Sequence, residues 1–417
     1  MSYIPRAVDY TINLALQSVG AVLLEGPRGC GKTETGLHVT NSQIRLDQSS
    51  SRELALLSPS KALEGATPRL IDEWQMVPEI WNEIRHEIDA RRSPGQFVLS
   101  GSASPADDST RHTGAGRFSR TRMRPLALGE QFQSVPGITL NQLLSEPKLE
   151  VMLSEVSYLQ LAELAVRGGW PGLIGLALQP SMRFNRDYIE NIVHADMSQL
   201  GSDFAPERVR RLLRSISRNS SSEAAATTLS ADVSADGGSV APVTVRKYLD
   251  ALARIFVLEE LPAWSGSLRS KSRLRKQPRL HFCDPSLACA ALQISPDSLA
   301  TDPEFFGQIF ESMAVRDLRT YAEQIDAYCF GYRDESNLEI DLLMEFFAGG
   351  WAGFEVKLGE SPGVLESAER NLLRIANDRM KQPPKFLAII TGGSRLFTLP
   401  SGVHVVPLAL LRPIMAG

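Results

Sequence analysis

The sequence has few cysteines, and they are widely spaced. Cys30, Cys283, Cys289 and Cys329 include no CxxC pair, so they match neither a zinc site nor a disulfide framework. Long apolar runs are also missing, because none reaches the length of about 18 residues that a helix needs to cross a bilayer. The N-terminus lacks the apolar core of a signal peptide. We therefore expect a cytoplasmic protein without a membrane partner, which folds without disulfides or structural metals.

A large excess of either charge is missing as well. The 417 residues include 44 Lys and Arg against 48 Asp and Glu, a formal net charge of −4. The overall charge therefore gives no sign of nucleic-acid binding, and any such surface must be local. Hydrophobic residues make up 43% of the chain, which is ordinary for a globular protein. The length predicts about three domains.

The clearest motif present is a glycine-rich loop near the N-terminus. An apolar run, Ala21 to Leu24, leads into GPRGCGKT at residues 26–33, and a helical stretch follows. In a P-loop, GxxxxGK[ST], glycines let backbone N–H groups face phosphates, the lysine reaches the β and γ phosphates, and the hydroxyl ligates Mg²⁺. We therefore expect ATP and Mg²⁺ as cofactors, with Lys32 catalytic and Thr33 on the metal. The predicted cofactor-binding residues in and after the loop are Gly26, Pro27, Arg28, Gly29, Cys30, Gly31, Lys32, Thr33 and Glu34.

An acidic pair follows at the end of the next apolar strand. Residues 69–71 run directly into Asp72 and Glu73. P-loop ATPases use one such carboxylate for the Mg²⁺ shell and another for the attacking water, so we assign Asp72 to the metal and Glu73 to catalysis. A helix-capping pair is the structural alternative. A small-molecule kinase, the other P-loop class considered, has less need of the second acid.

Two further positions are candidates for contact with the γ-phosphate. A strand predicted over Gln96–Ser100 ends in a Ser-Gly turn, where its last residue and Ser102 are sensor candidates; a plain turn is the alternative. The basic stretch 111–124 contains Arg117, which we assign as a catalytic arginine acting in the same chain or on a neighbouring subunit of a homo-oligomer. The later arginines are expected in a solvated loop before a strand over Arg122–Leu128.

Taken in order, these motifs resemble a known family. GPRGCGKT, LIDEWQ, LSGSASP, GR before PLALGE, and GGWPGL at 168–173 are similar to bacterial and archaeal ATPases with an AAA-type N-terminal domain and a C-terminal DUF4143 region. The resemblance covers most of the chain. It implies an α/β fold: a P-loop AAA-type ATPase domain with a parallel sheet, then a winged-helix segment and an α/β restriction-endonuclease-like domain.

We place the domain boundaries accordingly. Residues 1–200 form the ATPase domain, with a helical extension from about residue 140, followed by a winged-helix domain at 201–284 and the DUF4143-type domain at 285–417.

The winged-helix prediction carries a candidate DNA-binding surface. A helix is predicted over 243–257, followed by wing strands at 258–261 and 280–282. Residues 266–279 contain six basic and no acidic residues, which suits contact with phosphates. Inter-domain packing is the alternative use of such a segment. The predicted nucleic-acid-binding residues are Arg246 and Lys247 at the helix start, and Arg269, Lys271, Arg273, Arg275 and Lys276.

The last third of the chain contains a second candidate site. Helix 305–321, strands 327–333, 338–346 and 351–358, helix 361–379 and strand 385–391 follow the core order of the restriction-endonuclease-like fold. Strand alternation places Glu355 and Lys357 on one face. We assign Asp341 and Glu355 as catalytic metal ligands, Glu311 as a further metal ligand, and Lys357 as a catalytic residue. An inactive fold whose polar residues are structural is the alternative.

The sequence thus predicts a Mg²⁺-dependent ATPase that acts on DNA. Its nucleotide state would control a winged-helix and nuclease-like C-terminal region. The alternative function is that of a nucleotide-switched interaction protein, in a defence or toxin–antitoxin setting, whose C-terminal fold binds a protein partner and cleaves nothing.

Overall fold

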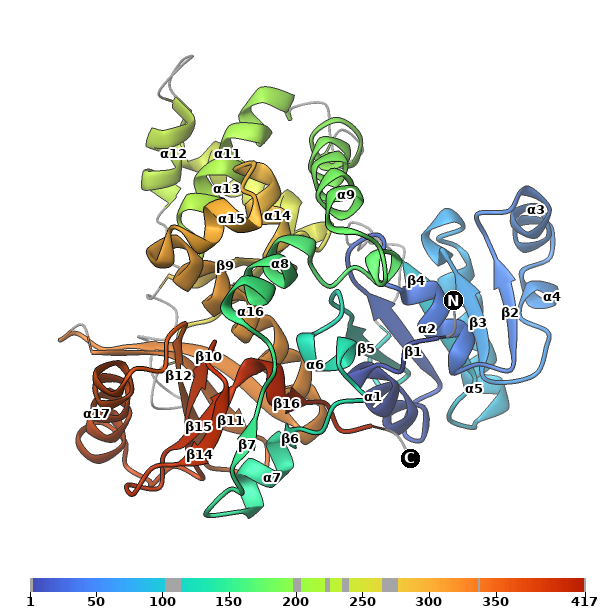
Figure 1. Cartoon of the computed structure of the whole chain (residues 1–417). Helices are drawn as coiled ribbons and strands as arrows, with labels where there is room; N and C mark the ends of the chain where they lie inside the picture. Colours follow the sequence, from blue (N-terminus) through green and yellow to red (C-terminus); the bar gives the residue numbers. More distant parts are fainter. Residues whose placement is uncertain are drawn as a thin grey trace.

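The computed structural model describes residues 3–101, 114–197, 204–221, 226–234, 240–264, 277–336 and 338–415. Figure 1 shows a parallel sheet formed by the N-terminal part and a larger mixed sheet formed by the C-terminal part, with a group of helices near both. The order of the first sheet is β2-β3-β4-β1-β5, and all its pairs are parallel. Its strands are β1 (Ala21–Glu25), β2 (Ser42–Arg45), β3 (Arg69–Asp72), β4 (Phe97–Gly101) and β5 (Phe118–Arg122).

This sheet is apolar on both faces, as parallel sheets covered by helices usually are. Along β1, Val22 and Leu24 pack with α1 (Ala7–Leu16), whereas Ala21 and Leu23 pack in the cluster on the other face. The remaining elements of this part are α2 (Lys32–His38), α3 (Ser49–Leu57), α4 (Pro59–Ala62), the 3₁₀ turn η1 (Trp74–Met76) and α5 (Ile80–Arg91).

The prediction of a strand over Arg122–Leu128 is wrong. Strand β5 comes earlier, and the short helix α6 occupies Leu128–Gln131. Pro125 has no N–H to give to a sheet, and the N–H of Leu126 donates instead to the carbonyl of Gly169 at 2.6 Å. The chain therefore leaves the sheet at this point and passes to the C-terminal part.

A largely helical segment joins the two sheets. Within it, β8 and β9 pair antiparallel, as expected for the predicted strands, and α13 precedes them. Its classification as a winged helix stays a prediction. The elements are α8 (Tyr158–Arg167), η2 (Pro171–Leu173), α9 (Leu178–Asn191), the π-helix η3 (Ile192–Asp196), α11 (Pro206–Arg218), α12 (Ala226–Ser234), α13 (Pro242–Arg254), β8 (Leu258–Leu261), β9 (Arg279–Phe282), α14 (Ser286–Ala291) and α15 (Pro296–Ala300).

The C-terminal sheet has the order β10-β11-β12-β13-β15-β14-β7. Helices α16 and α17 pack against its opposite faces, where they belong to two separate apolar clusters. The predicted order of helix, three strands, helix and strand is present. The elements are α16 (Pro303–Ala322), η5 (Glu323–Ile325), β10 (Ala327–Arg333), β11 (Glu339–Phe346), β12 (Trp351–Lys357), α17 (Pro362–Asp378), β13 (Leu387–Thr391), β14 (Arg395–Thr398), β15 (His404–Pro407), η6 (Leu408–Leu410) and β16 (Leu411–Arg412).

An early segment of the chain joins this second sheet. Strand β7 (Met152–Leu153) pairs with β14, and β6 (Ile138–Thr139) pairs with β16; α7 (Leu140–Ser145) lies between them in sequence. The predicted helical extension from about residue 140 therefore also contains strands. Across the described ranges, no helix is both long and apolar enough to cross a membrane.

Candidate nucleotide site and C-terminal acidic site

The P-loop lies at the carboxyl edge of the parallel sheet. Strand β1 ends at Glu25, α2 begins at Lys32, and the neighbouring strand β3 ends at Asp72. The Thr33 hydroxyl donates to the two carboxylate oxygens of Asp72 at 3.0 and 3.2 Å, and the hydroxyl of Ser100 on β4 also donates to Asp72. The structure thus brings the two predicted Mg²⁺ ligands together. A hydroxyl and a carboxylate are the oxygen donors that Mg²⁺ prefers, so these residues fit the metal.

The side chain of Lys32 lies inside the loop. Its ammonium donates to the carbonyls of Gly26 and Pro27, both at 2.8 Å, and the residue is 6% exposed. Gly29 and Gly31 have φ angles of 76° and 102°, values that favour glycine. Of the other predicted binding residues, Arg28 and Glu34 are exposed and Cys30 is buried.

Glu73 has an unusual backbone conformation. Its φ and ψ of 54° and 44° are left-handed, which costs a non-glycine residue about 1–3 kcal/mol and is found often at functional sites. Its half-buried carboxylate accepts a hydrogen bond from the side-chain amide of Gln75. This conformation turns the chain sharply between β3 and η1, so that Asp72 and Glu73 are not successive residues of one strand.

The expectation that Arg117 contacts the γ-phosphate in its own chain is wrong. Its carbonyl accepts from the N–H of Ala21 at the start of β1, so Arg117 lies at the edge of the sheet opposite the P-loop. Its guanidinium pairs with Asp89 at 2.7 Å. The parallel strand direction decides this, because β5 carries the chain from Arg117 towards the P-loop edge. Action on a neighbouring subunit stays a prediction, and Ser102 lies outside the described residues.

Several residues contact the P-loop without belonging to a predicted site. Arg28 forms an ion pair with Asp196 on η3, and the Tyr188 hydroxyl donates to the Arg28 carbonyl at 3.0 Å. A Cβ built on Gly29 would lie 3.9 Å from the ring of Trp170. The GGWPGL motif therefore packs beside the loop. Nothing in the local sequence of Tyr188 or Asp196 indicates this position.

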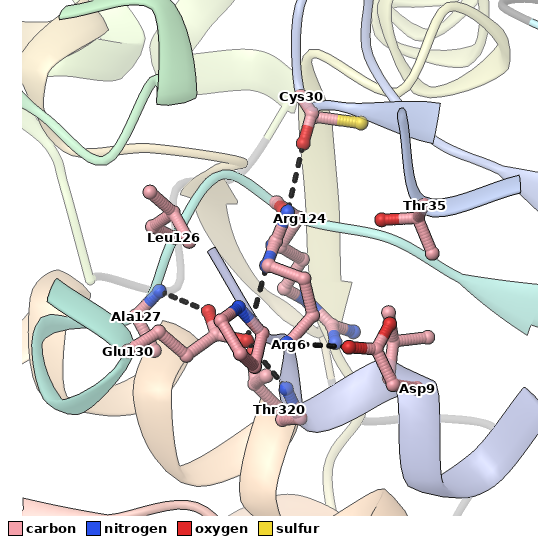
Figure 2. Close-up of polar contacts among 12 residues, drawn as sticks. Arg6, Asp9, Cys30, Thr35, Arg124, Leu126, Ala127, Glu130 and Thr320 are labelled. Carbon is pink, nitrogen blue, oxygen red and sulfur yellow. Dashed lines mark hydrogen bonds and ion pairs between the residues drawn. The ribbon is translucent and has the colours of Figure 1, made fainter. Parts of the chain in front are cut away.

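Arg6 connects the P-loop to the rest of the chain. Figure 2 shows its buried guanidinium between the loop, the segment after β5 and α6. It donates to the carbonyl of Cys30 at 3.0 Å, to the carbonyl of Arg124 at 2.7 Å and to the carboxylate of Glu130 at 3.1 Å. Glu130 also accepts from the N–H groups of Ala7 and Ala127. The backbone of the P-loop is thereby held to α6.

Arg124 extends these contacts into the C-terminal part. Its buried guanidinium pairs with Glu259 on β8 at 3.0 Å and with Glu323, which follows α16, at 2.9 Å. Burial would raise the pKa of Glu259, but the charges of Arg124 and then Arg319 lower it to about 2. The expectation of a solvated loop is therefore wrong for Arg124. It is also wrong for Arg120, which lies on β5.

Asp341, Glu355 and Lys357 meet on neighbouring strands. The Lys357 ammonium lies 3.8 Å from Asp341 and 3.5 Å from Glu355. Phe330 pairs with Leu343 and Tyr332 with Ile340, so two residues of β11 stand opposite one residue of β10. This β-bulge redirects the side chain of Asp341, which accepts a hydrogen bond from the N–H of Val356 at 2.6 Å.

Burial strongly affects the protonation of this cluster. The pKa of Glu355 is raised to about 8, first by burial and then by the charge of Asp341. Burial would lower the pKa of Lys357, but Asp341, Glu355 and Glu311 together raise it. One carboxylate oxygen of Glu355, Oε2, is buried and has no hydrogen-bond partner. Two converging carboxylates with a free acceptor fit one divalent cation held by Asp341 and Glu355.

Glu311 belongs to the same cluster but faces an arginine. The guanidinium of Arg279 lies 3.4 Å from Glu311 and 3.8 Å from the carboxylate of Asp341, and it donates to the backbone carbonyl of Asp341 at 3.1 Å. No group of three or more His, Cys, Asp or Glu in the described part of the chain is arranged to hold a metal ion. The expectation of a third carboxylate ligand in Glu311 is therefore wrong for this arrangement, because Arg279 takes that position as a resident cation.

The structure describes two of the seven predicted nucleic-acid-binding residues. Arg246 and Lys247 are exposed on the first turns of α13, where the Lys247 ammonium lies 5.5 Å from the centroid of the Phe204 ring. Arg269, Lys271, Arg273, Arg275 and Lys276 lie outside the described residues.

Comparison with known proteins matches separate parts of the chain to different family models. Residues 18–132 match the family model described as AAA domain, and residues 306–411 match the domain of unknown function DUF4143. The chain thus contains an AAA domain followed by a C-terminal DUF4143 region. The helical segment between these two regions, at residues 158–298, matches a further domain of unknown function, DUF8612.

Two curated relatives and two solved structures are similar to this chain at low sequence identity. The AAA–DUF4143 chain is 26% identical over 405 residues to uncharacterized proteins of Mycobacterium bovis and Mycobacterium tuberculosis, covering 94% of this chain and 81% of theirs. A Walker-type ATPase of Pyrococcus abyssi is similar with a TM-score of 0.42 and 13% identity, over 70% of this chain and 96% of its own. DnaA of Aquifex aeolicus bound to AMPPCP has a TM-score of 0.24 and 14% identity, over 58% and 86%.

Proposed function

We propose that the AAA domain binds and hydrolyses ATP with Mg²⁺. The proposal is carried by the contact between Thr33 and Asp72 at 3.0 Å, beside Lys32 in a complete P-loop. Lys32 would hold the β and γ phosphates, and Thr33 and Asp72 would hold the metal. Bound Mg²⁺ supplies neutralisation of the phosphate charge. Glu73 would accept a proton from the attacking water.

The test of this assignment is the variant Glu73→Gln. We expect hydrolysis to slow by about 10²–10⁴-fold, because the amide cannot act as a general base, while ATP binding is retained. Phosphate release and binding of a fluorescent ATP analogue measure the two effects. Glu53→Gln, at an exposed position of α3, is the matched control. Equal hydrolysis by Glu73→Gln and wild type would remove Glu73 from the mechanism.

We further propose that the C-terminal region acts on DNA, with cleavage at the acidic site. Asp341 and Glu355 would hold Mg²⁺, whose chemistry is the polarisation of a phosphodiester and its attacking water. Lys357, 3.5 Å from Glu355, would orient the phosphate. The exposed residues Arg246 and Lys247, together with the basic stretch 269–276, would contact the DNA backbone through salt-dependent interactions.

Cleavage is tested on single- and double-stranded DNA with Mg²⁺ or Mn²⁺, with and without ATP. We expect Asp341→Asn and Lys357→Ala each to reduce metal-dependent cleavage by at least about 100-fold, since each removes charge from the reacting site. Asp378→Asn, exposed at the end of α17, is expected to cleave normally. Cleavage that survives both substitutions would place the nuclease activity elsewhere, or in a contaminant.

The resident Arg279 favours a second candidate function. A guanidinium between Glu311 and Asp341 neutralises the cluster without a metal, as in an interaction protein whose nuclease-like region cleaves nothing. DNA or protein binding without cleavage by wild type would support this function. Cleavage abolished by Asp341→Asn would exclude it.

A series of buried contacts supports the proposal that nucleotide controls the C-terminal region. Arg6 bonds the P-loop carbonyl of Cys30, and Arg124, whose own carbonyl Arg6 contacts, pairs with Glu323 after α16. Helix α16 also carries Glu311 of the acidic cluster. A shift of the P-loop on nucleotide binding would therefore reach the helix behind the second site through buried charged groups.

A further inference from the structure

A cavity lies beside α8, and its lining residues are remote in sequence from those of both sites. It has a volume of about 670 Å³ and is formed by the loop after α6, β7, α8 and the C-terminal segment 409–412. Much of its wall is apolar, contributed by Phe132, Val135, Met152, Val156, Leu164 and Leu410. A cavity of this size and composition suits a small organic molecule.

Arg412 is a buried cation in the wall of this cavity. It is 7% exposed. Its Nε donates to the carbonyl of Val135 at 3.0 Å, and its Nη1 donates to the carbonyls of Ala409 and Leu411 at 2.8 and 3.0 Å. These three bonds hold the guanidinium in place. Its Nη2 is buried without a hydrogen-bond partner, and within the described residues no carboxylate forms an ion pair with Arg412.

Arg167 lines the same cavity from the last turn of α8. The residue is half-buried and its Nε is buried without a partner; among the described residues its guanidinium forms neither a hydrogen bond nor an ion pair, although its backbone carbonyl accepts from Asn185. Leaving donors of a guanidinium buried and unpaired is costly. Two arginines without a carboxylate partner among the described residues therefore stand in the wall of one cavity, where a bound anion would balance their charge.

Two acidic residues at the cavity favour an anion with a single negative charge. Glu155 and Glu163 also line it, and both are exposed. They would repel a doubly charged phosphate more than a singly charged group. A carboxylate accepts paired hydrogen bonds from a guanidinium. An apolar body on the same ligand would pack against the aliphatic and aromatic side chains of the cavity wall. We propose that this cavity binds a small monocarboxylate with an apolar body.

The test measures binding of octanoate to the full chain by titration calorimetry, with octanol and octyl phosphate as comparison ligands. We expect saturable one-to-one binding of octanoate, and binding at least about tenfold weaker for octanol, which lacks the charge, and for octyl phosphate. Unsaturable uptake of octanoate, or binding of octanol or octyl phosphate as tight as that of octanoate, would overturn the proposal.

Variants locate the binding. Arg167→Met and Arg412→Met are each expected to weaken octanoate binding by at least about tenfold. Arg183→Met, an exposed arginine of α9 whose only ion pair within the described residues is with Asp187 at 3.7 Å, is the matched control and is expected to bind normally. Arg412 also donates to three backbone carbonyls, so Arg167→Met is the deciding variant if Arg412→Met does not fold. Unchanged binding by folded Arg167→Met would overturn the proposal.

Discussion

Lys32→Ala is expected to reduce ATP hydrolysis by at least about 100-fold, the scale of removing one charged group that stabilises a transition state. The Lys32 ammonium lies 2.8 Å from the carbonyls of Gly26 and Pro27, inside the loop that would surround the phosphates. Alanine removes the positive charge that would hold the γ-phosphate, together with both of these hydrogen bonds. Phosphate release at saturating ATP measures the loss, and binding of a fluorescent ATP analogue shows whether affinity falls with it.

Lys61→Ala is the matched control for this experiment. Lys61 is exposed on α4, away from the P-loop in sequence, so its loss should leave hydrolysis unchanged. Full hydrolysis by Lys32→Ala would contradict the assignment of the P-loop as the ATPase site. A coincident loss of thermal stability would mean that the variant reports on folding, and Lys32→Gln would then be the comparison to make.

Arg124→Met is expected to have the largest effect on stability. Methionine would fill much of the space, but it would leave Glu259 buried beside Arg319 at 3.3 Å as the remaining ion pair. Removing one partner of a buried ion pair costs about 3–5 kcal/mol, because the other charge stays desolvated. The free energy of unfolding in urea measures this cost. Arg120→Met, which breaks an exposed pair with Glu25, should cost no more than about 1 kcal/mol.

The same variant should change the response of stability to acid. Arg124 and Arg319 hold the pKa of Glu259 near 2, against a usual value of 4.5. The unfolded chain therefore binds a proton at a higher pH than the folded chain does, so this contribution to stability is present above pH 4.5 and is lost as the pH falls towards 2. Arg124→Met should lose less stability across that window. A cost within about 1 kcal/mol and an unchanged acid response would show that Glu259 is satisfied without Arg124.

The sequence by itself determined the P-loop and most of the strands around it. The P-loop pattern and the apolar strands on either side are short-range signals, because loop glycines, a strand buried on both faces and the helix that follows are set by neighbouring residues. That Thr33 and Asp72 would meet also followed from sequence, since parallel strands end at one edge of the sheet. The strands carrying Asp341, Glu355 and Lys357 were also predicted, from short strand-like runs bounded by turn residues.

Only the tertiary structure decided which charged side chains meet across long separations. Arg6 and Glu130 are 124 residues apart, and Arg124 and Glu323 are 199 apart, and no period or spacing in the sequence links them. Arg117 shows the opposite case, in which a suitable residue type lies at the wrong edge because strand direction places it there. The bulge at Asp341 and the position of Arg279 depend on pairing between distant strands. Contacts of this kind arise from the packing of the whole chain, so a local pattern of residues does not predict them.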